Sequence, residues 1–264
     1  MYSFNYHRPA SVAEAAALLA ANADAKLVAG GQTFIPTLKQ RRAQPSDLID
    51  LGRIVELAGI SEEAGGVTIG AMTKHYAVAS SDVVKRVIPS LAALAELIGD
   101  PQVRNRGTIG GSISNNDPAA DYPGALLALG ATVRTSKREI AADDFFTGMF
   151  ETALEADEIV TAVHFPKPDK GAYVKFPNPA SRYSMVGVFV ARTGGAVHVA
   201  VTGAGACAFR WTDAEAALAT NFAPEAIDGL SVDAGELNGD MHASAEYRAH
   251  LIKVMAKRAV AAAA

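Results

Sequence analysis

Two pairs of adjacent glycines constrain this chain more than any other feature of its sequence. The first pair lies in Ala29-Gly30-Gly31-Gln32-Thr33-Phe34, and the second lies in Thr108-Ile109-Gly110-Gly111-Ser112. Glycine has no Cβ, so such positions can adopt positive φ and bring bare backbone N–H groups up to an anion. Either pair alone would more often only reverse the chain, but their occurrence together favours two phosphate-binding turns, which would suit the diphosphate of a dinucleotide.

The sequence around the first pair has the order strand, turn, helix. Residues 26–28 are a short apolar run typical of a strand, and residues 35–41 have a helical pattern that tolerates Pro36 in its first turn. The helix dipole would add to the attraction of the turn for a negative charge. Thr33 and Ser112, the small hydroxyl residues that follow the two pairs, could each donate a hydrogen bond to a phosphate oxygen.

The second pair lies in a long polar segment, residues 100–123, between apolar helical patterns at 89–98 and 125–129. We interpret this segment as a loop, and a loop of this length is ordered for a reason, of which ligand binding is the one that the glycines favour. Asp117 and Asp121 flank Pro118 within it. Their spacing favours a proline turn with acidic corners over a pair of ribose ligands.

The remaining pattern predicts both helices and strands. Its 264 residues, half of them hydrophobic, are enough for two domains, and the run of Pro, Gly and charge at 166–171 is the best linker. Ser11 with Glu14, and Thr212 with Glu215, resemble capping boxes at helix starts. Further helices are predicted at 73–79 and from residue 244, the last with Tyr247, Leu251, Val254 and Met255 facing inward. Strands are predicted at 48–51, 55–60, 67–69, 132–134, 159–165, 173–176, 185–192 and 197–202, with a hairpin turn at 194–195.

A third glycine-rich segment, residues 202–208, fits the dinucleotide fingerprint G-x-G-x-x-A. It follows a strand, but Phe209-Arg210-Trp211 stands where the helix of such a motif should continue. We therefore interpret it as a corner between two strands and not as a cofactor site.

Composition excludes several classes of function. The net charge is −4 and the basic residues are scattered, so nothing indicates nucleic acid or a membrane surface as a partner. Cys207 is the only cysteine, which excludes an iron–sulfur cluster bound by this chain alone. The six histidines lack metal-site spacing, and no Ser/His/Asp signature is present, so we predict neither metal ligands nor catalytic residues. Without a signal-like or membrane-spanning run, the chain is expected to be cytoplasmic.

The quoted glycine stretches resemble those of the FAD-binding medium subunit of the molybdenum hydroxylases, the family of xanthine dehydrogenase and aerobic carbon monoxide dehydrogenase. The second stretch carries the likeness within IGDPQVRNRGTIGGSISNNDPAADYP. The likeness extends nearly from end to end, through residues 6–9, 48–51, 144–148 and 181–185. It differs at Gln32, where some relatives have histidine, and at Ser181-Arg182, where many have Gly-Asp.

The resemblance implies an α+β fold with a two-lobed FAD-binding domain of the vanillyl-alcohol-oxidase (PCMH) type and a smaller C-terminal α+β domain. The FAD-binding domain would span residues 1–167, with lobes of about 1–52 and 53–167, and the C-terminal domain residues 171–264. Residues 29–34 and 108–112 would wrap the FAD diphosphate. Asp121 would lie near its ribose and phosphate end, and Lys175 and Tyr183 near the isoalloxazine.

The resemblance also implies partners. Substrate would be hydroxylated at a molybdopterin centre in a large subunit, and electrons would pass through [2Fe–2S] clusters of a small subunit to FAD in this chain and on to an external acceptor. The assembly expected is a dimer of heterotrimers, in which this oxidoreductase subunit is inactive alone on the organic substrate. The substrate and the acceptor are not specified by this chain.

Two other hypotheses compete with this one. A self-sufficient flavin oxidoreductase on the same fold would need its own acid–base group in a substrate pocket, and the sequence offers none. A scaffold subunit that has lost FAD would not need its glycine turns intact.

Overall fold

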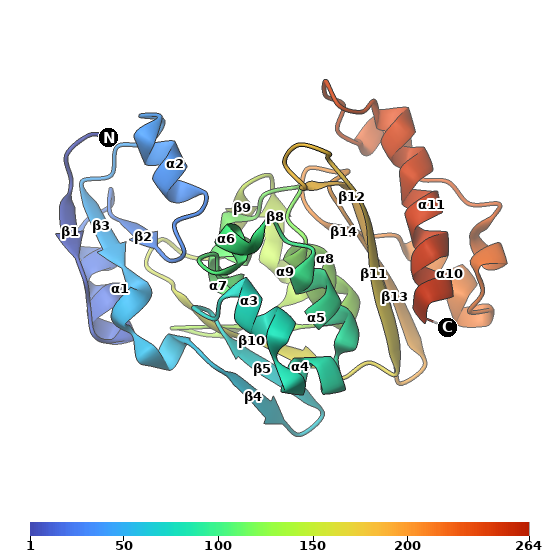
Figure 1. Ribbon diagram of the computed structural model, residues 1–264, viewed down its shortest axis with the longest axis horizontal. Helices are drawn as coiled ribbons and strands as arrows, with labels where there is room; N and C mark the ends of the chain where they lie inside the picture. Colours follow the sequence, from blue (N-terminus) through green and yellow to red (C-terminus); the bar gives the residue numbers. More distant parts are fainter. Residues whose placement is uncertain (264) are drawn as a thin grey trace.

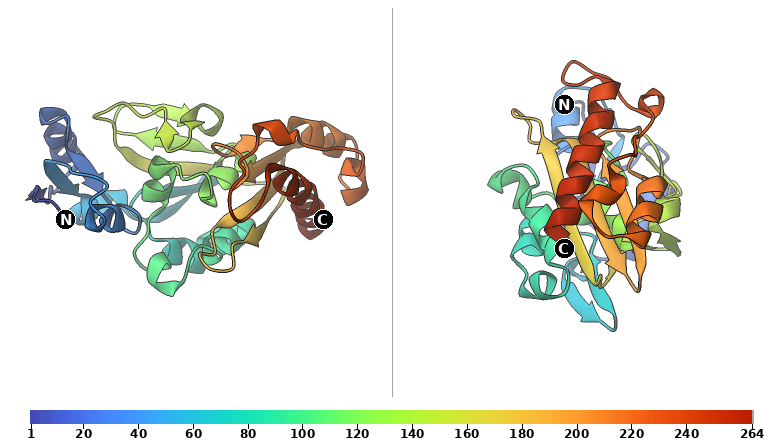
Figure 2. Two further views of the ribbon diagram at one scale, coloured as in Figure 1. Left: turned by 90° about the horizontal axis from the view of Figure 1, so that it is seen from above. Right: turned by 90° about the vertical axis from the view of Figure 1, so that its right-hand side faces the viewer.

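A computed structural model describes residues 1–263 of the chain. Three segments follow one another along its long axis, each with its own sheet (Figures 1 and 2). The N-terminus lies at one end of the row, and the C-terminal helix lies at the other. The two ends of the chain are therefore far apart, and the central segment contacts both of the outer ones.

The N-terminal segment is a small parallel sheet with a helix on each face. Strands β1 (Asn5–His7), β3 (Asp47–Asp50) and β2 (Lys26–Val28) pair in the order β1-β3-β2. Successive residues of a strand point to opposite faces, so Ile49 packs with Ala15 of α1 (Val12–Ala21) on one face, and Leu48 packs with Leu38 of α2 (Phe34–Lys39) on the other. Burial on both faces explains why β3 is apolar at consecutive positions.

The central segment is built on an antiparallel sheet in the order β4-β5-β10-β6-β7. Its helices pack their apolar residues onto that sheet in the largest core of the molecule, which includes Leu91, Ile109 and Leu126. A two-stranded ribbon, β8-β9, lies beside them. The strands are β4 (Ile60–Glu63), β5 (Gly66–Gly70), β6 (Thr132–Thr135), β7 (Glu139–Ala141), β8 (Phe146–Gly148), β9 (Glu151–Thr152) and β10 (Val160–Pro166). The helices are α3 (His75–Ser80), α4 (Asp82–Val87), α5 (Pro89–Glu96), α6 (Pro101–Arg104), α7 (Ile109–Asn115), α8 (Tyr122–Leu129) and α9 (Ala142–Phe145).

The C-terminal segment is a four-stranded antiparallel sheet covered on both faces. Strands β11 (Lys170–Pro177), β12 (Ser184–Thr193), β13 (Ala196–Thr202) and β14 (Phe209–Arg210) pair in sequence order. Phe189 faces the central core, whereas Val188 faces a second core under α10 (Thr212–Thr220) and α11 (Ala245–Ala263). Figure 1 shows this sheet standing between the central helices and α11, and the right view of Figure 2 shows α11 lying across it.

Several sequence-based predictions were wrong locally. Residues 100–123 are not one loop, because α6, α7 and the start of α8 lie within them. Residues 55–57 form a 3-10 helix and not a strand. The capping box predicted from Thr212 and Glu215 does not form, because the Thr212 side chain makes no capping hydrogen bond at the start of α10. Glu215 instead accepts a hydrogen bond from the Val199 N–H of β13. Tyr247 is exposed on α11. By contrast, the helix start at Ser11, the turn at 194–195 and the corner at 202–208 are confirmed.

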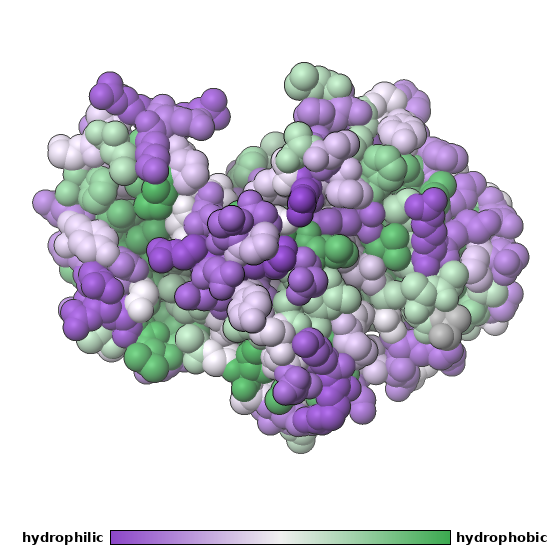
Figure 3. Space-filling model, in the orientation of Figure 1, coloured by the Kyte–Doolittle hydropathy of each residue, from purple (hydrophilic) through white to green (hydrophobic). Residues whose placement is uncertain are grey.

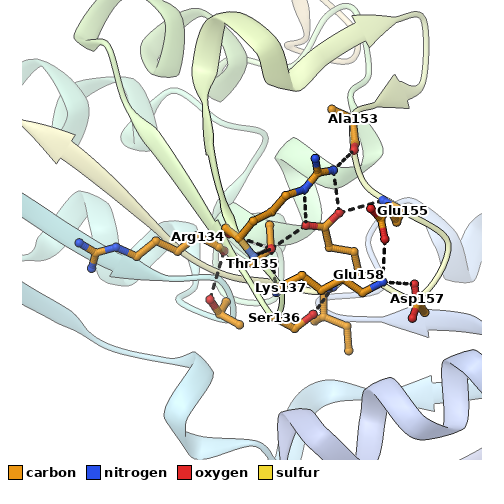
Figure 4. Close-up of polar contacts among 11 residues, drawn as sticks. Arg134, Thr135, Ser136, Lys137, Ala153, Glu155, Asp157 and Glu158 are labelled. Carbon is orange, nitrogen blue, oxygen red and sulfur yellow. Dashed lines mark hydrogen bonds and ion pairs between the residues drawn. The ribbon is translucent and has the colours of Figure 1, made fainter.

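A buried carboxylate fixes the turn before β10 (Figure 4). Both oxygens of Glu158 accept from the Arg138 guanidinium at 3.1 Å, and Oε1 also accepts from the Thr135 hydroxyl at 2.7 Å. Oε2 accepts from the Glu155 N–H at 2.9 Å. The Glu158 side chain is fully buried, and these donors, Arg138 first among them, lower its pKa from 4.5 to about 2.

This carboxylate predicts a specific loss of stability in acid. A pKa that is lower in the folded state stabilises the fold above the unfolded value of 4.5, and this contribution is lost as the pH falls from 4.5 towards 2. By linkage the full contribution is about 3 kcal/mol, of which about 2 kcal/mol is lost between pH 5 and pH 3. We expect the free energy of unfolding in urea to fall by about 2 kcal/mol over that range beyond what a Glu158→Gln variant loses. If the free energy of unfolding falls equally with pH in the wild type and in Glu158→Gln, this prediction is wrong.

Candidate functional site: a cleft between the glycine turns

A cleft of about 550 Å³ lies where the N-terminal segment meets the central one. Residues of the first glycine stretch form one wall, residues of the second stretch and of α7 form the other, and Arg182 and Tyr183 close one end. In Figure 3 a notch separates the N-terminal segment from the rest of the molecule. Of the predicted site residues, the cleft is lined by Ala29, Gly30, Gly31, Gln32, Thr33, Phe34, Thr108, Gly110, Gly111, Ser112, Asp121 and Tyr183.

The first glycine stretch keeps its backbone donors free. Within residues 1–263, none of the N–H groups from Gly30 to Phe34 donates to a protein acceptor. Gly31 has φ +72°, a conformation that L side chains rarely adopt, and this residue turns the chain from β2 into α2. Thr33 precedes α2 without a side-chain capping bond, and its side chain lies beside Tyr183. A row of donors at the start of a helix is suited to an anion.

The second glycine stretch is built differently from our expectation. The Ile109 and Gly110 N–H groups donate to the carbonyls of Thr73 and Ala71, at 3.1 and 2.8 Å. The N–H groups of Gly111 and Ser112 donate to Thr108, at its hydroxyl and its carbonyl. The prediction that this pair presents bare N–H groups was therefore wrong, because the start of α7 uses them to attach to the end of β5.

The glycines of the two stretches instead allow the walls to approach each other. A Cβ at Gly30 would lie 2.3 Å from the Arg106 carbonyl oxygen and 2.7 Å from the Gly107 Cα. A Cβ at Gly110 would lie 2.6 Å from that of Ala71, so this glycine seats α7 on the sheet. At Gly111 a Cβ would lie 3.5 Å from the Cβ of Ala29, across the cleft. Ile109 is fully buried in the central core and supports the wall from behind.

Asp121 borders the cleft, but its carboxylate is bound inside the protein. Oδ1 accepts from the Tyr173 hydroxyl at 2.5 Å, from the Ser184 hydroxyl at 2.9 Å and from the Lys175 ammonium at 3.1 Å. Burial raises the pKa of Asp121, and the charge of Lys175 opposes that rise. The carboxylate therefore joins α8 to β11 and β12 and is not displayed for a ribose. Lys175 itself does not line the cleft.

Tyr183 is the predicted ring-facing residue that does reach the cleft. It lies at the end of the 178–183 loop between β11 and β12, and 45% of it is exposed. Burial of the remainder raises its pKa, the charge of Asp117 adds to the rise, and the Thr33 side chain opposes it. The tyrosine from the C-terminal segment thus faces the first glycine stretch.

The sequence analysis missed part of the lining. His75, one of the six histidines to which the sequence analysis gave no role, lines the cleft. Burial lowers its pKa to about 4, so it is neutral at neutral pH. The His75 ring fits because Gly107 has no side chain. A Cβ built at Gly107 would lie 2.6 Å from the His75 Nε2. No spacing rule indicates such a residue. Other lining residues that we did not predict include Met72, Ile98, Gly99, Val103, Ile159 and Val160.

Comparison with known proteins shows which proteins this chain is similar to. The model of the family "FAD binding domain in molybdopterin dehydrogenase" matches residues 2–168, more than half of the chain. The chain belongs to this family. The nicotine 6-hydroxylase medium subunit of Paenarthrobacter nicotinovorans is 36% identical over 273 residues, covering 98% of this chain and 96% of that subunit. The carbon monoxide dehydrogenase medium chain of Hydrogenophaga pseudoflava is 38% identical over 277 residues, with coverage of 98% and 96%.

Solved structures agree with this assignment. Reconstituted CO dehydrogenase from Oligotropha carboxidovorans superposes with a TM-score of 0.91 at 35% identity, covering 99% of this chain and 98% of that one. The expected fold and family are thereby confirmed. The protein is an oxidoreductase subunit of the molybdenum hydroxylases, and FAD is its cofactor.

The residues of the cleft fit this cofactor. A dinucleotide needs donors for its diphosphate and an apolar slot for its ring, and the cleft offers the free N–H row of Gly30 to Phe34 beside the apolar side chains of Ile98 and Val160. Its volume is within the range of cofactor pockets. Within residues 1–263 no group of His, Cys, Asp or Glu side chains is arranged to hold a metal ion. No helix in that range has both the length and the apolar character needed to cross a bilayer.

Proposed function

We propose that this chain relays electrons from the [2Fe–2S] clusters of a partner subunit, through FAD held in the cleft, to an external acceptor. The observation that carries the proposal is the row of unused backbone donors from Gly30 to Phe34, facing a second wall across a cleft of cofactor size. The medium-subunit names of the relatives support the division of labour. The lone cysteine requires that any clusters belong to another chain.

The proposed assembly follows from the same division. A large molybdopterin subunit would oxidise the organic substrate, a small subunit would carry the [2Fe–2S] clusters, and two such heterotrimers would form the complex. Within this chain we propose an FAD-binding domain at residues 1–167, with lobes 1–52 and 53–167, and a C-terminal domain at 171–264. A cytoplasmic location is also proposed.

Each wall has its own task in this scheme. FAD supplies reversible one- and two-electron chemistry when bound. The N–H groups of Gly30 to Phe34 and the hydroxyls of Thr33 and Ser112 would hold its diphosphate. Tyr183 would cover the ring and limit the access of water. No acid–base group is assigned, because electron relay does not require one from the protein.

The complex purified from cells expressing all of its subunits tests this function. We expect FAD in the isolated chain, iron and molybdenum only in the larger complex, and reduction of the FAD when the iron–sulfur subunit is reduced. Turnover of an organic substrate by the isolated chain would favour a self-sufficient oxidoreductase. A colourless chain that releases no flavin on denaturation would contradict both.

Tyr183→Ala tests the ring-facing assignment. We expect this variant to keep its FAD, because the diphosphate donors lie in another segment, but to show altered rates of flavin reduction and reoxidation. Stopped-flow absorbance of the flavin band in the complex measures both rates. Rates equal to those of the wild type would remove Tyr183 from the ring face.

A further inference from the structure

The ammonium group of Lys175 is buried at the junction of three pieces of the cleft. Only 4% of the side chain is exposed, and within residues 1–263 its Nζ has acceptors for all three of its N–H groups. These are the Leu97 carbonyl at 2.9 Å, the Asp121 carboxylate at 3.1 Å and the Arg182 carbonyl at 3.0 Å. A buried lysine with this set of partners has no donor left for a ligand.

Each partner is next to, or part of, the lining of the cleft. Leu97 directly precedes the lining residue Ile98, and Asp121 and Arg182 are themselves lining residues. The three come from the end of α5, the start of α8 and the 178–183 loop. Lys175 therefore ties the ends of two central helices, α5 and α8, to the loop that carries the tyrosine.

That loop has an unfavourable conformation that needs such a tie. Arg182 has φ +63°, a left-handed conformation that is unfavourable for a residue with a side chain. The loop closes on itself, since the Arg182 N–H donates to the Asn178 carbonyl and the Asn178 N–H donates to the Tyr183 carbonyl, both at 2.8 Å. These bonds shape the loop but do not orient it relative to the cleft. The Arg182 carbonyl is oriented by Lys175.

We propose that Lys175 is a positioning residue that sets where Tyr183 lies over the flavin ring. The inference rests on the proposed function, because it takes the cleft as the flavin site. It gives a specific role to Lys175, which was expected near the isoalloxazine. A lysine acting in this way changes the flavin only through Tyr183, which distinguishes it from a residue that supplies charge to the ring.

The test compares the fluorescence of bound FAD in four holoproteins: wild type, Lys175→Met, Tyr183→Ala and the double variant. An aromatic ring on the flavin quenches its emission, so Tyr183→Ala should brighten it. We expect Lys175→Met to raise the emission towards that of Tyr183→Ala, with no further rise in the double variant. Lys170→Met, on the same strand β11 but exposed, serves as the control and should match the wild type.

A second variant distinguishes an effect on the position of Tyr183 from an effect on the stability of the protein. Lys175→Met leaves the Asp121 carboxylate buried without its cation, so Lys175→Met/Asp121→Asn removes both charges and should recover much of the lost stability. If Lys175 positions the tyrosine, this pair of substitutions still brightens the flavin although the protein is stable. Emission that returns to the wild-type level with the stability would show a purely structural lysine.

Other outcomes also decide the question. Wild-type emission in Lys175→Met beside a bright Tyr183→Ala would overturn the inference and leave the proposed function intact. A brightening that adds to that of Tyr183→Ala would show that Lys175 acts on the ring directly, and would also overturn it. A wild-type chain without FAD would overturn the proposed function itself.

Discussion

Gly30→Ala is expected to lose most of its FAD during purification. A Cβ at this position would lie 2.3 Å from the Arg106 carbonyl oxygen and 2.7 Å from the Gly107 Cα. Both are backbone atoms, which cannot rotate away as a side chain would, so the two walls of the cleft must separate. Overpacking of this kind costs about 3 kcal/mol, which corresponds to roughly 100-fold weaker binding if the strain is relieved by moving the donors. Flavin content per chain, measured after denaturation, and titration of the flavin-free protein with FAD provide the check.

The control for this prediction is Gly229→Ala. No atom lies within 4 Å of a Cβ built at Gly229, so this variant should bind FAD like the wild type. Full FAD occupancy and unchanged affinity in Gly30→Ala would show that the approach of the two walls does not matter for the cofactor.

Asp121→Ala should cause the largest loss of stability among single changes near the cleft. It leaves the Lys175 ammonium buried without a counter-charge and removes the acceptor of the Tyr173 and Ser184 hydroxyls. Breaking one partner of a buried pair costs about 3–5 kcal/mol, a large part of the 5–15 kcal/mol that stabilises a typical domain. Urea unfolding followed by the fluorescence of Trp211, the single tryptophan, measures the loss.

An exposed ion pair provides the comparison. Glu62 accepts two hydrogen bonds from Arg86 with both side chains well exposed, so solvent screens this ion pair and Glu62→Ala should cost little stability. If Asp121→Ala costs no more than Glu62→Ala, the buried network does not hold the segments together.

Local features were predictable where one stretch of sequence contains its own cause. The Ser11 side chain caps α1 by accepting from the Glu14 N–H, three residues later, and adjacent glycines at 194–195 turn β12 into β13. The corner at residues 202–208 was predicted because the bulky residues after it oppose a helix. Long-range effects account for the errors: Glu215 was assigned to a cap that its bond to β13 overrides.

The family resemblance predicted the cofactor, but it did not predict which contacts each side chain makes. Lys175 and Asp121 were expected near the ring and near the ribose and phosphate end, and the structure adds that they are bound to each other and that Lys175 is also bound to two backbone carbonyls. Gly110 and Gly111 were expected to offer N–H groups, and their lack of Cβ atoms serves close packing instead. Which task a glycine performs depends on what lies opposite it, and the opposite atoms come from elsewhere in the chain.

The sequence by itself determined the two glycine stretches and the need for partners to supply any iron–sulfur clusters, because each of these depends on residue type and local spacing, and its resemblance to a known family supplied the class of fold. Only the tertiary structure decided which stretch keeps its donors free, that His75 lines the cleft and that Lys175 joins three of its pieces. Those properties arise when α5, α8 and the 178–183 loop meet, and contacts between residues distant in sequence leave no local pattern.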